Sequence, residues 1–92
     1  MIKGETKSGF KWKVADDALN DQELVETLAF EDDSDPRVVT KIAIKVLGQE
    51  QKQKLYEHVR NKKTGRVPSD KFQLEIAEIF DEIGKTNEEI KK

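Results

Sequence analysis

The chain has 92 residues, a formal net charge of −2 at pH 7, 35% hydrophobic and 39% charged residues, and no cysteine. The absence of thiols excludes disulfides, thiolate catalysis and cysteine-ligated zinc. A chain of this length buries only about 60 to 65% of its unfolded surface, so we expect a modest core without a deep catalytic cleft. It has no run of about 18 apolar residues and no start typical of a signal peptide, so we expect a cytoplasmic protein without a membrane span.

Residues 1–14 are predicted to form a flexible or extended arm. Within it, residues 1–7 show no regular pattern and are expected to be disordered. The following segment alternates, with Phe10, Trp12 and Val14 on one side and lysines on the other, which is the period of a strand. Two interpretations of Phe10 and Trp12 stay open: they cover a small core, or they anchor another protein.

Residues 15–84 are predicted to form a helical domain, whose first helix starts at Asn20 and runs to about Phe30. Asn20 is a good N-cap, and Glu23 occupies the reciprocal position of a capping box. The expected apolar face of this helix consists of Leu24, Val25 and Leu28.

Three further helices are predicted. The second runs from Pro36 to Leu47, since Asp35 is a favourable N-cap and proline suits the first helical position. Gly48 is expected to end it, and the third helix then covers residues 49–61. The fourth starts near Pro68 and ends at Gly84, and residues 85–92 are expected to be a polar, disordered tail. The expected inward-facing residues are Val39, Ile42, Ala43, Val46 and Leu47, then Leu55, Tyr56 and Val59, then Phe72, Ile76, Ile79, Phe80 and Ile83. The predicted fold class is therefore all-α, a small bundle of about four helices with a short extended N-terminal arm.

His58 is the only histidine, and it lacks the partners that catalysis or metal binding requires. A zinc or iron site without cysteine needs several histidines, or a histidine with converging carboxylates. No serine or threonine stands in the sequence context of an activated nucleophile. The acidic run 31–35 is similar to the start of a calcium loop, but Pro36 and Ile42 occupy the positions that need glycine and glutamate. We therefore expect no catalytic residue, no metal site and no cofactor.

Charge is segregated along the chain. From residue 16 to 35 every charged side chain is acidic, whereas from 37 to 66 all except Glu50 and Glu57 are basic. The basic segment around Gly48 invites comparison with a helix-turn-helix motif, but Lys54 and Glu57 stand where the second helix of that motif must pack. Narrow apolar stripes favour binding to another protein instead. The expected protein-binding residues are Phe10, Trp12, Lys52, Tyr56 and Arg60.

The order of several segments resembles the small tail assembly chaperones of long-tailed bacteriophages and prophages of Gram-positive bacteria. These segments are GFKWKV at 9–14, NDQELVETLA at 20–29, the helix between Asp35-Pro36 and Val46-Leu47-Gly48, QKQKLYEHVR at 51–60, GRVP at 65–68 and EIFDE at 78–82. The resemblance covers roughly residues 9–84. Their order and spacing carry it more than any single segment does.

The resemblance implies a small helical protein without catalytic activity. Such chaperones coat the long, helix-rich tape measure protein, keep it soluble and recruit tail tube subunits in the host cytoplasm. The oppositely charged segments lead us to expect weak, salt-sensitive self-association of successive copies. The alternatives are another structural or adaptor protein of a phage particle, and a small nucleic-acid-binding regulator that uses residues 37–66.

Overall fold

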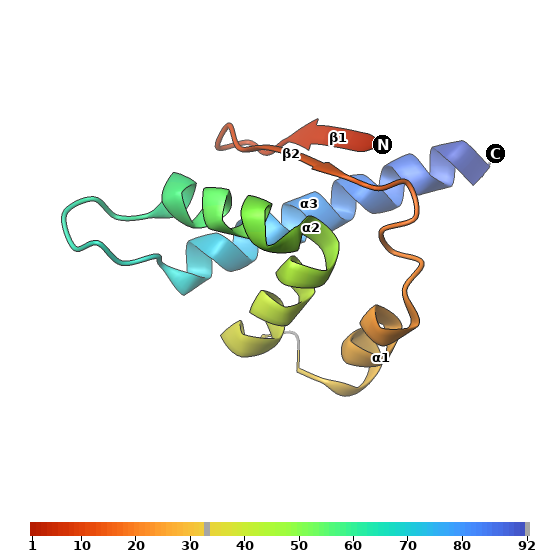
Figure 1. Ribbon diagram of the computed structural model, residues 1–92, viewed down its shortest axis with the longest axis horizontal. Helices are drawn as coiled ribbons and strands as arrows, with labels where there is room; N and C mark the ends of the chain where they lie inside the picture. Colours follow the sequence, from red (N-terminus) through yellow and green to blue (C-terminus); the bar gives the residue numbers. More distant parts are fainter. Residues whose placement is uncertain (33, 92) are drawn as a thin grey trace.

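The computed structural model describes residues 1–32 and 34–91 as a two-stranded sheet followed by three helices (Figure 1). The strands are β1 (Ile2–Glu5) and β2 (Lys11–Val14), and the helices are α1 (Gln22–Phe30), α2 (Pro36–Val59) and α3 (Ser69–Lys91). Most of the chain is helical, as expected. The predicted all-α class holds only roughly, because the described residues form three helices and not four, and the N-terminal arm is a β-hairpin.

β1 and β2 pair in antiparallel register, with Ile2 opposite Val14 and Gly4 opposite Trp12. This pairing corrects the prediction that residues 1–7 are disordered. β1 has the sequence IKGE, which has little intrinsic strand preference, so the pairing with β2 and the burial of Ile2 hold it in place. Phe10 and Trp12 are 6% and 4% exposed, which supports the core interpretation of this aromatic pair.

α1 is short and only partly buried. Its N-cap is Asp21, one residue later than predicted, and the Asp21 carboxylate accepts hydrogen bonds from the backbone N–H groups of Glu23 and Leu24. Leu24 is buried, but Val25 and Leu28 are 49% and 48% exposed. The predicted apolar face of this helix therefore leaves apolar surface open to solvent.

α2 begins as predicted, with Asp35 as its N-cap and Pro36 in its first turn. At Gly48 the backbone leaves the helical conformation, with φ 84° and ψ 164°, and α2 then continues to Val59. Only glycine reaches this combination of angles without strain, so the predicted break at Gly48 is present as a kink between two helical segments. The predicted second and third helices are the two halves of one kinked helix.

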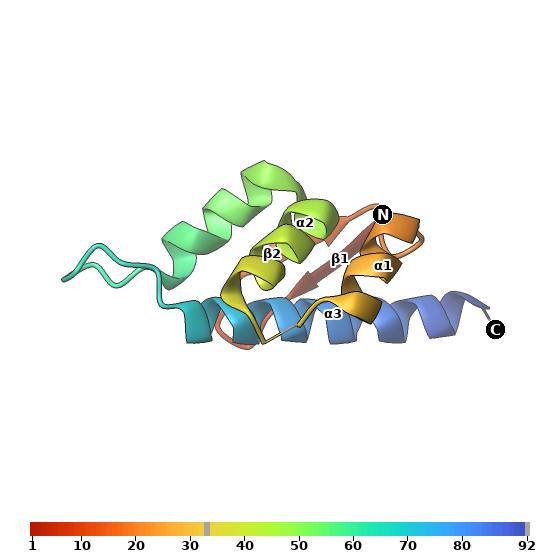
Figure 2. The same cartoon turned by 90° about the horizontal axis from the view of Figure 1, so that it is seen from below.

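α3 is a long helix that packs against both α2 and the hairpin (Figure 2). Its buried residues Phe72, Ile76, Ile79 and Ile83 complete the core between these elements. α3 continues past the predicted end at Gly84, because a glycine in helical conformation weakens a helix without ending it. The predicted tail is thus helical as far as Lys91, and residue 92 lies outside the described residues. No helix within the described ranges is both long and apolar enough to cross a membrane.

Candidate protein-binding groove

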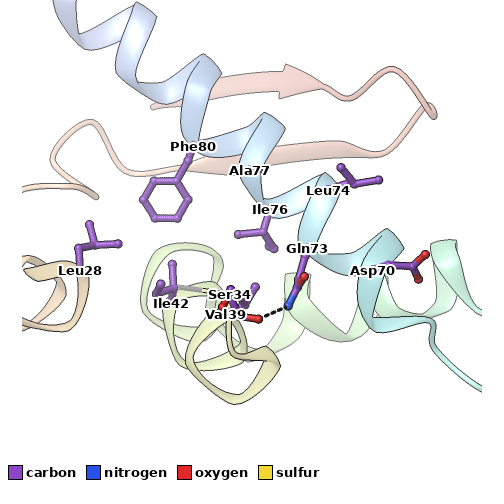
Figure 3. A pocket seen from close by; sticks show the side chains of 10 residues that line it. All are labelled: Leu28, Ser34, Val39, Ile42, Asp70, Gln73, Leu74, Ile76, Ala77 and Phe80. Atoms are coloured by element: carbon purple, nitrogen blue, oxygen red, sulfur yellow. Dashed lines mark hydrogen bonds between the residues drawn. The ribbon is translucent and has the colours of Figure 1, made fainter. Parts of the chain in front are cut away.

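An apolar groove of about 570 Å³ lies between α1, the first half of α2 and the first half of α3 (Figure 3). Leu28 comes from α1, Ser34 from the segment before α2, and Val39 and Ile42 from α2. The residues that α3 contributes are Asp70, Gln73, Leu74, Ile76, Ala77 and Phe80.

The walls of the groove combine buried and exposed apolar side chains. Val39, Ile42 and Ile76 belong to the core, whereas Leu28 is 48% exposed and Phe80 is half-buried. Leu28 and Phe80 lie toward the same end of the groove, on facing elements (Figure 3). An apolar surface with this shape gains free energy when another protein covers it and removes it from water.

The opposite end of the groove carries polar and acidic side chains beside the exposed Leu74 (Figure 3). Gln73 donates a hydrogen bond from Nε2 to the backbone carbonyl oxygen of Ser34 over 3.3 Å, which ties α3 to the segment before α2. Asp70 lies at this end, in the first turn of α3 (Figure 3). The hydroxyl and backbone N–H of Ser34 donate hydrogen bonds to Asp32 and hold the pKa of that carboxyl below its usual range. The groove is therefore mainly apolar and carries one carboxylate, that of Asp70, at this end.

A separate polar cluster joins the hairpin to α2 and α3, beside a second hollow of about 520 Å³. Glu75 on α3 is 6% exposed, and its Oε1 accepts hydrogen bonds from the hydroxyl of Thr6, over 3.2 Å, and from the hydroxyl of Ser8. The Ser8 oxygen also lies 2.9 Å from Nε2 of His58. The fold thus gives His58 the serine neighbour that no sequence motif indicates.

The cluster contains a serine, a histidine and a carboxylate, but their order differs from that of a catalytic triad. In a triad, one ring nitrogen of the histidine accepts the serine proton and the acid binds the other nitrogen. Here Glu75 accepts a hydrogen bond from the hydroxyl of Ser8, and the Ser8 oxygen lies beside Nε2 of His58. Glu75 Oε1 lies 3.9 Å from that same nitrogen. These hydrogen bonds fasten the hairpin to the helices, and the carboxylate lies near the same ring nitrogen as the serine, whereas in a triad it binds the other one.

The structure places the five predicted binding residues outside the lining of the groove. They are Phe10, Trp12, Lys52, Tyr56 and Arg60. The two hairpin aromatics lie in the core. Lys52 is 9% exposed, and its Nζ lies 4.7 Å from the centre of the half-buried Tyr56 ring. Arg60 donates from Nη1 to the carbonyl oxygen of Gly65 over 2.6 Å and so closes the turn after α2. The contacts of these residues are mainly internal.

Sequence reasoning missed the groove residues Leu28, Asp70, Ala77 and Phe80 as a group. Leu28 and Phe80 follow the apolar period of their helices, and periodicity assigns such residues to the core. Ala77 is the one indication of the groove in the sequence. It is a small residue between larger apolar side chains of α3, so it leaves space on that face of the helix.

Comparisons with family models, with curated proteins and with solved structures find no match for this chain. The class of protein is therefore inferred from the sequence and the structure of this chain. An apolar groove between helices, with a few polar groups at one end, is typical of sites that bind an amphipathic helix.

Proposed function

We propose that this protein is a non-enzymatic tail assembly chaperone, which binds the tape measure protein and helps to recruit tail tube subunits in the host cytoplasm. The observation that carries the proposal is the apolar groove with the half-exposed Leu28 in its wall. An amphipathic helix covers such a groove by laying its apolar face into it. The resemblance of residues 9–84 to tail assembly chaperones supports the choice of partner.

The groove suits a complex that forms and dissociates readily. Its walls offer a small apolar area, which favours weak binding at each site along a long helical partner. Many weak contacts along one chain together give stable coverage, although each copy still dissociates quickly when a tube subunit displaces it. A long amphipathic helix needs this kind of coverage to stay soluble until the tube polymerises around it.

The same proposal includes weak association between successive copies. The turn between α2 and α3 carries the exposed residues Lys62, Lys63 and Arg66 and protrudes from the body of the molecule, away from α1 and the acidic segment 16–35 (Figures 1 and 2). Surfaces of opposite charge attract one another at low salt and are screened at high salt. Sedimentation should show larger species at about 0.01 M salt than at about 1 M salt. Identical sedimentation at both concentrations would argue against this association.

Co-expression with a tape measure protein from the same phage or prophage tests the main proposal. The wild-type chain should raise the soluble fraction of the tape measure protein, and Leu28→Asp should abolish this effect by placing a charge in the wall of the groove. Val25→Asp is the matched control, since Val25 lies one turn earlier on α1, has the same exposure and is outside the groove lining. No effect of the wild-type chain, or an equal loss in both variants, would overturn the proposal.

A further inference from the structure

We infer that the groove selects an amphipathic helix that carries a lysine or arginine beside one end of its apolar stripe. The inference rests on the proposed function, because it specifies the chemistry of the helix that the groove binds. Three observations support this inference: the position of charge along the groove, the ion pairs formed by nearby cations, and the length of the groove.

The first observation is the position of charge within the groove. Among the described residues that line it, Asp70 is the one charged side chain. Asp70 lies at the end opposite Leu28 and Phe80, and the hydrogen-bonded pair Gln73 and Ser34 lies between (Figure 3). A helix with apolar residues alone would cover the apolar walls and leave the exposed carboxylate of Asp70 without a complementary charge.

The second observation is that two cations on the first half of α2 already have acidic partners. Lys41 forms an ion pair with Glu31 over 2.8 Å, and Arg37 forms one with Asp35 over 2.9 Å. Within the described residues, no ion pair involves Asp70 or Asp32. Neither Lys41 nor Arg37 is therefore paired with Asp70, and a cation on the partner that pairs with this carboxylate lowers the free energy of the complex.

The third observation is the length of the groove along α3. Asp70 and Phe80 are ten positions apart on one helix, which corresponds to about 15 Å at 1.5 Å per residue. A partner helix lying along α3 places apolar side chains at i, i+3 or i+4, and i+7 against the apolar end. The lysine or arginine of the partner helix then lies about ten residues from the far end of the apolar stripe on that helix. This spacing is a sequence pattern that can be searched for in any candidate partner.

Two synthetic helical peptides test the inference against the full-length chain. Both carry the same apolar stripe, and they differ only in the residues that flank it at both ends, which are lysine in one peptide and glutamate in the other. The wild-type chain should bind the lysine peptide about fivefold more tightly at low salt, the range expected for one exposed ion pair. Asp70→Lys should reverse the preference, and high salt should reduce it in both cases. Asp17→Lys makes the same change of charge away from the groove and should leave the preference as in the wild type.

The outcomes separate this inference from the proposed function. Equal affinity for both peptides, or the same preference in Asp70→Lys as in the wild type, overturns the inference, even if Leu28→Asp still abolishes the solubilisation of the tape measure protein. Failure of the lysine peptide to bind overturns it as well. The proposed function then stands or falls on the co-expression result alone.

Discussion

Gly4 on β1 lies against the indole of Trp12 on β2. The two residues are opposite one another in the hairpin, and a β-carbon built on Gly4 would stand 2.8 Å from Cε2 of the indole, closer than real β-carbons approach. A glycine inside a strand often marks a place where another group comes close to the backbone. At this position the missing side chain gives the indole its space and allows Trp12 to reach an exposure of only 4%.

Gly4→Ala is therefore expected to lower the free energy of unfolding by about 1 to 3 kcal/mol, the usual cost of overpacking a core. The new methyl group forces either the indole or β1 to move. Urea unfolding followed by Trp12 fluorescence measures the change. Lys3→Ala, at the adjacent exposed position, is the control and should cost less than about 0.5 kcal/mol. Equal stability of Gly4→Ala and the wild type would contradict the packing of the indole on β1.

The emission of Trp12, the only tryptophan, is expected to be blue-shifted in the free protein and to move to longer wavelength on unfolding. Adding a tape measure helix should leave the emission unchanged, because α1, α2 and α3 line the groove and the hairpin does not. A red-shifted emission in the free protein, or a shift on binding, would instead support the interpretation that Trp12 anchors another protein.

The parts of the fold that can be predicted from sequence are those that depend only on residues close together in the chain. The cap Asp35 with Pro36, and the apolar stripe of the first half of α2, depend only on residues within a few positions. β1 depends on a strand that follows it in the chain, and its own residues carry little signal. Gly48 marks a break correctly, but the choice between a helix end and a kink depends on whether the next segment finds a core, as Leu55 does.

The groove could not be predicted from sequence, because it depends on how the three helices are arranged around it. Leu28 and Phe80 have the spacing of core residues, and only the placement of short α1 across the groove from α3 leaves them partly uncovered. The polar cluster is hidden for the same reason. Ser8 and Glu75 are 67 positions apart and share no motif, so only the docking of the hairpin brings them together.

Gly48→Ala should lower the free energy of unfolding by about 1 to 3 kcal/mol, since the kink uses backbone angles that are strained for any residue with a β-carbon. Gly84→Ala is the matched control within α3. It should raise stability by about 0.5 to 1 kcal/mol, because alanine loses less conformational entropy in a helix.

A β-carbon added at either glycine meets no atom within 4 Å. The difference in the free energy of unfolding between the two variants therefore measures the cost of the backbone conformation at residue 48. Chemical denaturation of both variants measures it. If Gly48→Ala proved as stable as Gly84→Ala, α2 would run through residue 48 without a kink.

Glu75→Ala should lower the free energy of unfolding by about 1 to 3 kcal/mol, because it leaves the buried hydroxyl of Thr6 and that of Ser8 without their acceptor. Glu78→Ala is the control, one turn further along α3. Its carboxylate accepts a hydrogen bond from the exposed backbone N–H of Lys7, which water can replace, so the change should stay within about 0.5 kcal/mol. Hydrogen exchange adds a second readout, since loss of Glu78 should speed exchange only at the amide of Lys7, whereas loss of Glu75 should speed it in both strands of the hairpin. Equal costs and equal exchange in the two variants would show that the cluster does not fasten the hairpin to α3.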